Sequence, residues 1–246
     1  MASQHNESGK DSGTYGKAAK YYDLIYSFKD YDVEAAKIRE VIQREHSGAR
    51  SILDVACGTG EHAKRLARNF SVDGLDIEPE FVKIAQSKLQ YGFVTAGDMR
   101  NFKLARKYDV VQCLFSSIGY LTRGDDVIAA LRCFSEHLLP GGIVIVEPWI
   151  TPDKFEGGLP SMAPPVDKAD IKICRMHVSE RKGNISLLNF HYLVATRLGV
   201  ERLNESHELA LYSVEEMLAF FRAAGLNAEH DPVGIFGRGL YVARAL

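Results

Sequence analysis

The sequence predicts an α/β fold, with a doubly wound and mostly parallel sheet that carries an antiparallel β insertion after its fifth strand. Short apolar runs alternate with helical patterns over residues 32–146, which favours parallel strands joined by helices. Each run is apolar on both faces, as expected of strands that helices cover on either side. After Trp149 the pattern changes to a turn-rich segment and then to longer strand-like stretches, which favours an antiparallel unit.

The first half of the chain supplies the parallel sheet. Residues 32–43 predict a helix, because apolar side chains recur there at three- and four-residue spacing. Five apolar runs predict buried strands, at residues 51–56, 72–77, 93–96, 110–115 and 143–146. Residues 61–70 and 125–139 predict further helices, and Pro140-Gly141-Gly142 is expected to end the second of these. Ligands are expected beyond the carboxyl ends of such strands.

The second half supplies the insertion and the end of the sheet. Residues 150–170 are rich in proline and glycine and are expected to form a loop. Antiparallel strands are expected at residues 171–180, 185–195 and 201–212. Ser213 and Glu216 form a capping-box pattern that begins a helix, Gly225 ends it, and residues 239–246 predict a last strand. We therefore expect one domain over residues 1–246, composed of an N-terminal cap (1–31), a cofactor-binding core (51–149), the insertion (171–212) and the last helix and strand (213–246).

Composition and charge exclude several classes of protein. The 246 residues include 30 Lys and Arg against 32 Asp and Glu, which gives a formal net charge of −2. Because the charges are nearly balanced, neither a nucleic-acid nor a membrane-surface partner is predicted. The chain has no apolar run near the roughly 20 residues that a membrane span needs, and its polar first residues do not match a secretion signal. The four cysteines lie at spacings typical of neither a metal site nor a redox motif. We therefore expect a cytoplasmic protein with reduced thiols and no metal.

A glycine-rich turn follows the first predicted strand, in the segment LDVACGTG at residues 53–60. Glycines there let the backbone approach a ligand closely, and Asp76, at the end of the next strand, is placed to accept hydrogen bonds from a ribose diol. A dinucleotide and S-adenosylmethionine both fit this arrangement, and a turn without a ligand is a third interpretation. Asp54 and Glu61 oppose a diphosphate but suit a cofactor with an ammonium and a sulfonium. Gly97-Asp98-Met99 adds an acceptor for an adenine amino group and an apolar cover, so S-adenosylmethionine is favoured over NAD.

Several motifs resemble those of a known family. LDVACGTG, GLDIEP, GDMR and HLLPGG resemble class I S-adenosylmethionine-dependent methyltransferases, whose sheet is Rossmann-like, over the part of the chain before residue 150. Later segments resemble the dTDP-3-amino-sugar N,N-dimethyltransferases of the desosamine and mycaminose type, in VVQCLFSSIGY, VIVEPW, NFHYLVA, NESHELALY and GRGLYV. The resemblance extends over nearly the whole chain. It implies dimethylation of a dTDP-linked amino deoxysugar in natural-product biosynthesis, carried out by a homodimer.

The resemblance also implies roles for particular residues. Cofactor contacts are expected from Tyr22, which would close over the cofactor, and from Asp54, Ala56, Gly58, Gly60, Asp76, Ile77, Asp98, Met99, Phe115 and Ser116. Substrate contacts are expected from Tyr15, Tyr31, Ser117, Trp149 and Arg238. Arg238 lies between two glycines, which would let its guanidinium reach a diphosphate. Tyr120 and Tyr15 are the expected catalytic residues.

The chain departs from the family pattern at Tyr120. The sugar N-methyltransferases have a histidine after FSSIG, and a second tryptophan usually follows EPW where this chain has Ile150. A neutral amine needs alignment more than a base, because approximation lowers a barrier by roughly 7–11 kcal/mol whereas a general base contributes about 10²–10⁴-fold. A phenol is a poor base at neutral pH. We therefore expect Tyr120 to position the acceptor.

Two further interpretations stay open. The same fold could methylate another small-molecule amine or hydroxyl, or bind S-adenosylmethionine without catalysis. His177, His191 and His207 lie in the predicted insertion, where structural histidines are expected more than metal ligands.

Overall fold

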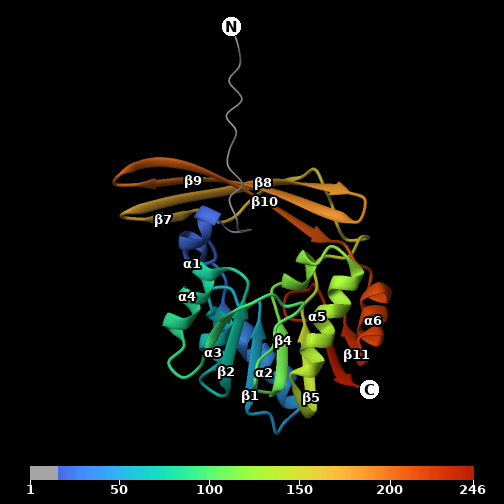
Figure 1. The fold of residues 1–246 in the computed structure, drawn as a ribbon. Coiled ribbons are helices and arrows are strands. Elements are labelled where there is room, and N and C mark those ends of the chain that lie inside the picture. The colour runs from blue at the N-terminus through green and yellow to red at the C-terminus, as the bar shows by residue number, and fades with distance from the viewer. Residues whose placement is uncertain (1–15) are drawn as a thin grey trace.

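The computed structural model describes residues 16–246, and Figure 1 shows a helix-covered sheet with a second sheet lying across one end of it. The strands of the central sheet are β1 (Ser51–Val55), β2 (Ser71–Asp76), β3 (Val94–Ala96), β4 (Tyr108–Cys113), β5 (Leu138–Val146), β11 (Leu226–Asp231) and β12 (Leu240–Ala245). Their spatial order is β11-β12-β5-β4-β1-β2-β3. The strands β1 to β5 are parallel, and β12 runs antiparallel to both of its neighbours.

Helices pack on both faces of the central sheet. The α-helices are α1 (Tyr22–Ile25), α2 (Tyr31–Glu45), α3 (Glu61–Leu66), α4 (Pro79–Lys88), α5 (Gly124–Glu136) and α6 (Val214–Ala223), and the 3-10 helices are η1 (Gly16–Tyr21) and η2 (Ser117–Tyr120). Neighbouring strand residues point to opposite faces. Ile52 joins a core with α2 and α3, whereas Leu53 joins a core with α5 and α6. Both side chains are fully buried, which explains why the runs are apolar on both faces.

The second sheet is antiparallel and comes from the chain between β5 and α6. Its strands are β6 (Pro160–Met162), β7 (Val166–Lys168), β8 (Ile171–Lys182), β9 (Ile185–Thr196) and β10 (Gly199–Ala210). One face packs on the N-terminal segment, where Ile173, Val194 and Leu203 share a buried cluster with Ala18 and Ile25. As a result, α1 lies between the second sheet and α4 (Figure 1).

The structure confirms the doubly wound α/β fold with its antiparallel insertion and corrects five details of the prediction. The run at residues 93–96 is not buried, because β3 is an edge strand and Phe93 is 78% exposed. Residues 150–170 are not all loop, because β6 and β7 pair with β8 there, and proline is tolerated at the start of such edge strands. The helix expected over 125–139 ends at Glu136, and Pro140-Gly141-Gly142 lies inside β5, beside a register shift against β4. The helix expected over 61–70 ends at Leu66. The strand β11 was not predicted, since it is an edge strand in which only Leu226 is buried.

The predicted start of α6 at Ser213 is confirmed. Ser213 accepts a hydrogen bond from the Glu216 N–H (3.2 Å) and the Glu216 carboxylate accepts one from the Ser213 N–H (2.8 Å), so the capping box is present. No helix within residues 16–246 is long and apolar enough to cross a membrane. The same residues contain no group of three or more His, Cys, Asp or Glu side chains that could hold a metal ion. The limits of the four expected parts of the domain stay a prediction.

Candidate active site

Two adjoining pockets lie beyond the carboxyl ends of the central strands. Each has a volume of about 510 Å³. The first is lined by the segments that follow β1, β2, β3 and β4, and the second is lined by the N-terminal segment, Trp149, Arg238 and one face of the second sheet. Tyr22, Phe115 and Tyr120 line both pockets. The two spaces therefore meet at these three aromatic side chains.

The glycine loop forms the floor of the first pocket. Gly58 lines the pocket with φ +55°, and a Cβ added there would meet no protein atom within 4 Å. A side chain at this position would therefore extend into the pocket and would strain the backbone. Asp76 fixes the loop, because its carboxylate accepts the N–H groups of Gly58 (2.7 Å) and Glu78 (2.9 Å). Burial raises the pKa of Asp76, and these backbone hydrogen bonds oppose the shift.

Asp54 lies beneath the same loop and is 2% exposed. Burial raises the pKa of its carboxyl to about 6, against the opposing effects of His62 and of the hydrogen bond from the Gln112 amide (3.0 Å). A buried carboxylate is costly unless a cation accompanies it. The first pocket therefore suits a ligand that brings a positive charge to the end of β1.

The end of β3 adds Asp98 and Met99 to the first pocket. Both carboxylate oxygens of Asp98 accept hydrogen bonds from the Arg100 guanidinium (2.5–3.0 Å), which holds the pKa of Asp98 below its usual value. Asp98 is therefore ionised but already engaged, so an adenine amino group would share it with Arg100. Met99 packs against the core under α5, and Ile77, 65% exposed, extends the apolar rim.

Phe115 and Ser116 form a strained wall between the pockets. Both are in the left-handed region, with φ +52° and +63°, which costs free energy and needs support from the surroundings. The buried Glu147 supplies it by accepting the Phe115 N–H (2.7 Å), and the Ser116 hydroxyl donates to the Pro148 carbonyl (2.7 Å). Burial raises the pKa of Glu147. This conformation places the Phe115 ring where both pockets contact it.

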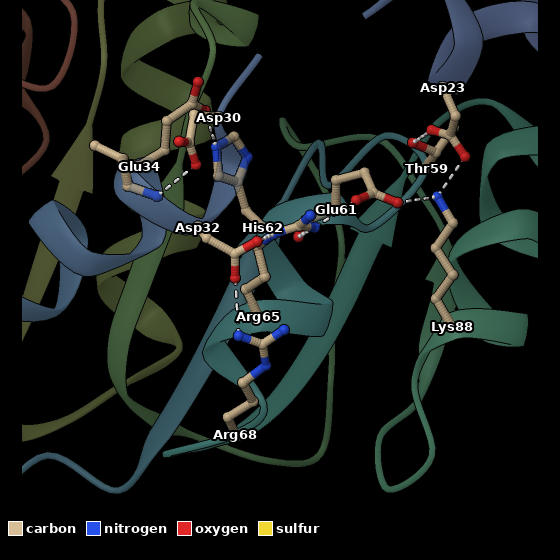
Figure 2. A network of polar contacts seen from close by, with 11 residues as sticks. Asp23, Asp30, Asp32, Glu34, Thr59, Glu61, His62, Arg65, Arg68 and Lys88 are labelled. Atoms are coloured by element: carbon tan, nitrogen blue, oxygen red, sulfur yellow. Dashed lines mark hydrogen bonds and ion pairs between the residues drawn. The ribbon is translucent and has the colours of Figure 1, made fainter. Parts of the chain in front are cut away.

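The N-terminal segment is fastened to the glycine loop by polar contacts. Figure 2 shows Asp23 of α1 between Thr59 and Lys88: its carboxylate accepts the Thr59 hydroxyl and the Lys88 ammonium, both at 2.5 Å. Lys88 also pairs with Glu61 (2.7 Å). The Tyr22 ring, next to Asp23, lies edge-on to Phe81 of α4, with 5.0 Å between ring centroids. These contacts hold Tyr22 at the edge of both pockets.

A second group of contacts in Figure 2 ties α2 to α3. Glu34, 3% exposed, lies 2.7 Å from His62 Nε2 and 3.2 Å from Lys29 Nζ. Lys29 extends into the second pocket, with its ammonium 3.7 Å from the centre of the Phe115 ring. Burial lowers the pKa of Lys29, and the Glu34 carboxylate opposes the shift.

Two guanidinium groups join Lys29 in the second pocket. Arg238 donates to the Ser116 hydroxyl (3.1 Å), and its guanidinium carbon lies 5.2 Å from the centre of the Trp149 ring. Arg175 lies 4.7 Å and 5.0 Å from the rings of Tyr26 and Phe190. Its Nε is buried and has no hydrogen-bond partner among residues 16–246. The second pocket therefore offers cationic donors that the described chain does not use up.

At the junction of the pockets, Tyr120 contacts a histidine of the second sheet. The Tyr120 hydroxyl lies 2.9 Å from His207 Nδ1. His207 is 2% exposed, and its Nε2 lies 3.6 Å from the Glu205 carboxylate. The sequence predicted a structural role for His207, and the structure places this buried histidine beside the expected catalytic tyrosine.

The predicted site residues gather at the two pockets with a few exceptions. The first pocket is lined by the expected cofactor residues Tyr22, Asp54, Ala56, Gly58, Asp76, Ile77, Asp98, Met99 and Phe115. The expected substrate residues Tyr31 and Ser117 line this pocket too, whereas Ser116, expected at the cofactor, lines only the second. Gly60 lines neither, because it is the N-cap of α3 and faces α4, where a Cβ added at Gly60 would lie 3.0 Å from the Ala85 Cβ. Tyr15 lies outside the described residues.

The sequence motifs did not indicate four residues of the two pockets and their walls: Lys29, Arg175, Glu205 and Glu147. Arg175 and Glu205 reach the site only through the register of β8, β9 and β10. In this register Tyr192 of β9 lies between Arg175 of β8 and Leu203 of β10, and it pairs with both. No spacing along the chain indicates that register. For Glu147, a signal was present in the sequence, since an acid directly after a buried strand lies at the ligand-binding edge of the sheet.

Comparison with known proteins identifies the family. Residues 52–142 match the family described as a methyltransferase domain. The dTDP-3-amino-3,6-dideoxy-alpha-D-glucopyranose N,N-dimethyltransferase of Streptomyces fradiae is 38% identical, over 98% of this chain and 96% of its own length. The structure of DesVI from Streptomyces venezuelae has a TM-score of 0.88 at 37% identity, covering 94% of this chain and 99% of that one.

A further solved structure contains the cofactor. SAM-bound CalS10, an amino pentose methyltransferase from Micromonospora echinaspora, has a TM-score of 0.83 at 30% identity, covering 98% of this chain and all (100%) of that one. The first pocket fits S-adenosylmethionine, because acidic side chains line it and because the backbone at Gly58 leaves room for a ligand. The cofactor of this enzyme is S-adenosylmethionine. The chain belongs to the dTDP-amino-sugar N,N-dimethyltransferases, a family of S-adenosylmethionine-dependent methyltransferases.

Proposed function

We propose that this chain transfers two methyl groups in succession to the amine of a deoxysugar linked to dTDP. The observation that carries this proposal is the second pocket, whose cations Lys29, Arg175 and Arg238 adjoin the acidic first pocket. Lys29 is already paired with Glu34 (3.2 Å), but a nucleotide diphosphate would supply negative charge for the two guanidinium groups, which bind phosphate oxygens through paired N–H donors. The N,N-dimethyltransferase relative from Streptomyces fradiae supports the same substrate class.

The first pocket is assigned to the cofactor, which supplies an electrophilic methyl group on a positively charged sulfur when it is bound. Asp76 would accept hydrogen bonds from the ribose hydroxyls, and Gly58 would let the backbone contact the ligand. Asp54 would balance the positive charge from beneath the loop. Ile77, Met99 and the engaged Asp98 would enclose the adenine.

The second pocket is assigned to the sugar nucleotide. Arg175 and Arg238 would bind the diphosphate, and Lys29 would add a third positive charge at the Phe115 ring. Trp149 would form an aromatic wall, since its indole N–H is already bonded to the Ser186 hydroxyl (2.8 Å) and its face lies toward Arg238. Tyr31 and Ser117, on the first-pocket side, would contact the sugar end, and Tyr15 keeps its predicted role near the substrate.

The chain's main contribution to catalysis would be alignment. Tyr120 lines both pockets, so its hydroxyl can contact an acceptor that reaches from the second pocket toward the first. Tyr22 and Phe115, at the same junction, would exclude water from the line of transfer. Holding the amine in line with the methyl group can lower the barrier by roughly 7–11 kcal/mol.

Mass spectrometry of the reaction tests this proposal. Purified protein is incubated with S-adenosylmethionine and either a dTDP-3-amino- or a dTDP-4-amino-deoxyhexose, and we expect a product one and then two methyl groups heavier from one of them. Absence of product from both sugars, with S-adenosylhomocysteine still bound, would contradict the proposal. Tyr120 and Ile150, the two departures from the family pattern, would then indicate another small-molecule amine or hydroxyl as acceptor.

The proposal includes a cytoplasmic homodimer. The outer face of the second sheet supports the dimer, because apolar side chains that are 44–72% exposed cluster there: Met162, Met176, Val178, Leu193 and Val200. Strand register places them on one face, since Met162 pairs with Met176 and Val200 lies opposite Ala195, two residues from Leu193. Exposed apolar patches of this kind mark interfaces.

A further inference from the structure

The Glu205 carboxylate has one unsatisfied oxygen on the wall of the second pocket. Glu205 belongs to β10 and lines this pocket, and its side chain is 6% exposed. Its Oε2 accepts the Tyr192 hydroxyl at 2.8 Å, whereas its Oε1 is buried and has no hydrogen-bond partner among residues 16–246. Buried polar atoms are nearly always hydrogen-bonded. Because Glu205 lines a pocket, we expect the missing donor to come from a ligand.

A buried donor lies on the same face of the second sheet. Arg175 of β8 also lines the second pocket, and its Nε likewise lacks a partner within the described part of the chain. Tyr192 stands between the two charges, since its backbone pairs with Arg175 and its hydroxyl donates to Glu205. Burial and the Glu205 carboxylate raise the pKa of this phenol, and Arg175 opposes the shift. Both charges therefore act on the same part of the pocket.

An acceptor beside a donor favours a hydroxyl over the other polar groups of a sugar nucleotide. A hydroxyl can donate one hydrogen bond and accept another, so it suits Glu205 Oε1 and Arg175 Nε together. An ammonium group would be repelled by Arg175, and a phosphate group would be repelled by Glu205. The terminal nitrogens of Arg175 stay available to the diphosphate, because a guanidinium has five N–H donors.

We propose that Glu205 is a specificity-determining residue that accepts a hydrogen bond from the 2-hydroxyl of the sugar. This inference rests on the proposed function, in which Arg175 binds the diphosphate. The diphosphate is attached at C1 of the sugar, so the hydroxyl that the same guanidinium can reach is the one on the neighbouring carbon, C2. The amine, on C3 or C4, then extends from Glu205 toward Tyr120 at the junction of the pockets.

A 2-deoxy sugar would leave the carboxylate oxygen without its donor. Loss of a hydrogen bond to a charged group has a larger effect than loss of a neutral one, and a site built for a hydroxyl discriminates against the analogue that lacks it. We therefore expect the wild-type protein to use the 2-deoxy analogue of its amino sugar with a kcat/KM about thirtyfold lower. Equal kcat/KM values for the two sugars would overturn the proposal.

Combining this change of substrate with Glu205→Ala tests the contact itself. We expect Glu205→Ala to lower kcat/KM about thirtyfold for the sugar with a 2-hydroxyl and less than about threefold for the 2-deoxy sugar. The 4-deoxy form of a 3-amino sugar, or the 3-deoxy form of a 4-amino sugar, is the matched control, because it keeps the 2-hydroxyl and should lose as much as the parent. A loss that is the same with and without the 2-hydroxyl would indicate a structural role and overturn the proposal.

Further variants separate the contact from the fold. Tyr192 is 4% exposed, so Glu205→Ala leaves a buried phenol without its acceptor, and the cycle is repeated in Tyr192→Phe, which removes that hydroxyl. Tyr192→Phe alone keeps Oε1 and should retain the preference for the 2-hydroxyl within about threefold. If it abolished the preference as completely as Glu205→Ala, the phenol would make the contact and the proposal would be wrong. Glu180→Ala removes an exposed carboxylate of β8 outside both pockets and should leave kcat/KM unchanged for every sugar.

Titration calorimetry of the same sugar nucleotides, with S-adenosylhomocysteine bound, needs no turnover. We expect the sugar with the 2-hydroxyl to bind about thirtyfold more tightly than the 2-deoxy sugar in the wild type, and the difference to vanish in Glu205→Ala. Equal affinities in the wild type, or binding of neither sugar, would overturn the proposal. If the wild-type chain methylates no amino sugar, the proposed function fails, and this difference in affinity still decides whether Glu205 binds the 2-hydroxyl.

Discussion

The two pockets differ in how their residues are distributed along the chain. The charged residues of the first follow consecutive strands, with Asp54 on β1, Asp76 on β2 and Asp98 after β3. The second draws Arg175 from β8 and Arg238 from the segment before β12, with other residues from the N-terminal segment. A short, local pattern defines the first pocket, whereas long-range sheet register defines the second.

The pockets also differ in charge, and the difference bears on chemistry. The first is lined mostly by acidic groups, whereas the second carries Lys29, Arg175 and Arg238 beside three carboxylates, and Phe115 lies between the pockets. Complementary charge orients ligands as well as attracting them. A cationic cofactor and an anionic sugar nucleotide would therefore each be held in their own pocket and meet at Tyr120. Experiments that separate the two binding events test this comparison directly.

The largest expected effect comes from a crossed pair of substitutions. Asp76→Asn weakens two charge-assisted hydrogen bonds to the glycine loop and should lower S-adenosylhomocysteine affinity about hundredfold, with dTDP binding unchanged. Arg238→Ala should abolish the thermal stabilisation by dTDP or a dTDP-sugar and leave S-adenosylhomocysteine binding unchanged. Titration calorimetry and thermal shift measure both ligands on both variants.

Arg222→Ala is the matched control for this pair, because it removes an exposed positive charge on α6. It should change neither binding event. The comparison between the pockets would be wrong if Arg238→Ala weakened both ligands equally, since the two pockets would then behave as one site.

The same contrast explains how far the sequence predicts this protein. Local features were accessible: the glycine loop and Asp76 need only a strand, a turn and the next strand, and the buried runs follow from their apolar composition. The strand β11 could not be predicted, because its charged residues lie at an edge and show no apolar periodicity. The positions of Arg175 and His207 at the site could not be predicted either, because only the pairing of β8, β9 and β10 determines which side chains of these strands face the site. Nearness to Tyr120 is a property of register and not of sequence spacing.

A smaller effect is expected on the pH dependence of stability. The carboxyl of buried Asp54 has its pKa raised to about 6 from 3.8, so the folded protein keeps this proton to a higher pH than the unfolded chain does. Its contribution to the free energy of unfolding therefore falls as the pH rises from about 4 to about 6, by up to about 3 kcal/mol, and stays low above that. Asp54→Asn removes this contribution.

We therefore expect Asp54→Asn, without cofactor, to be more stable than the wild type at pH 7.5 by up to about 3 kcal/mol, and this advantage to disappear near pH 4. Denaturant unfolding at both pH values measures it, with exposed Asp125→Asn as the control for loss of a charge. The cofactor affinity should fall, because the variant no longer balances its positive charge. An equal difference in stability at both pH values would indicate that Asp54 is ionised throughout.

The smallest expected effect on the pockets comes from the outer face of the second sheet. Met176→Lys places a charge at the centre of the apolar patch, next to Met162 in the strand register. Burying that charge in an interface would be costly, so we expect light scattering to show a dimer for the wild type and a monomer for the variant. Binding of S-adenosylhomocysteine and dTDP should be unchanged, since the pockets lie against the opposite face of the sheet.

Val233→Lys is the control, because Val233 is also exposed (66%) but lies in the segment between β11 and β12, away from the patch. It should remain a dimer. A monomeric wild type, or a dimer that tolerates lysine at both Met176 and Leu193, would contradict assembly through this face. A monomeric Met176→Lys variant with weaker dTDP binding would instead show that assembly holds the register of β8, and with it Arg175, in place. The second pocket would then depend on the partner subunit, whereas the first would not.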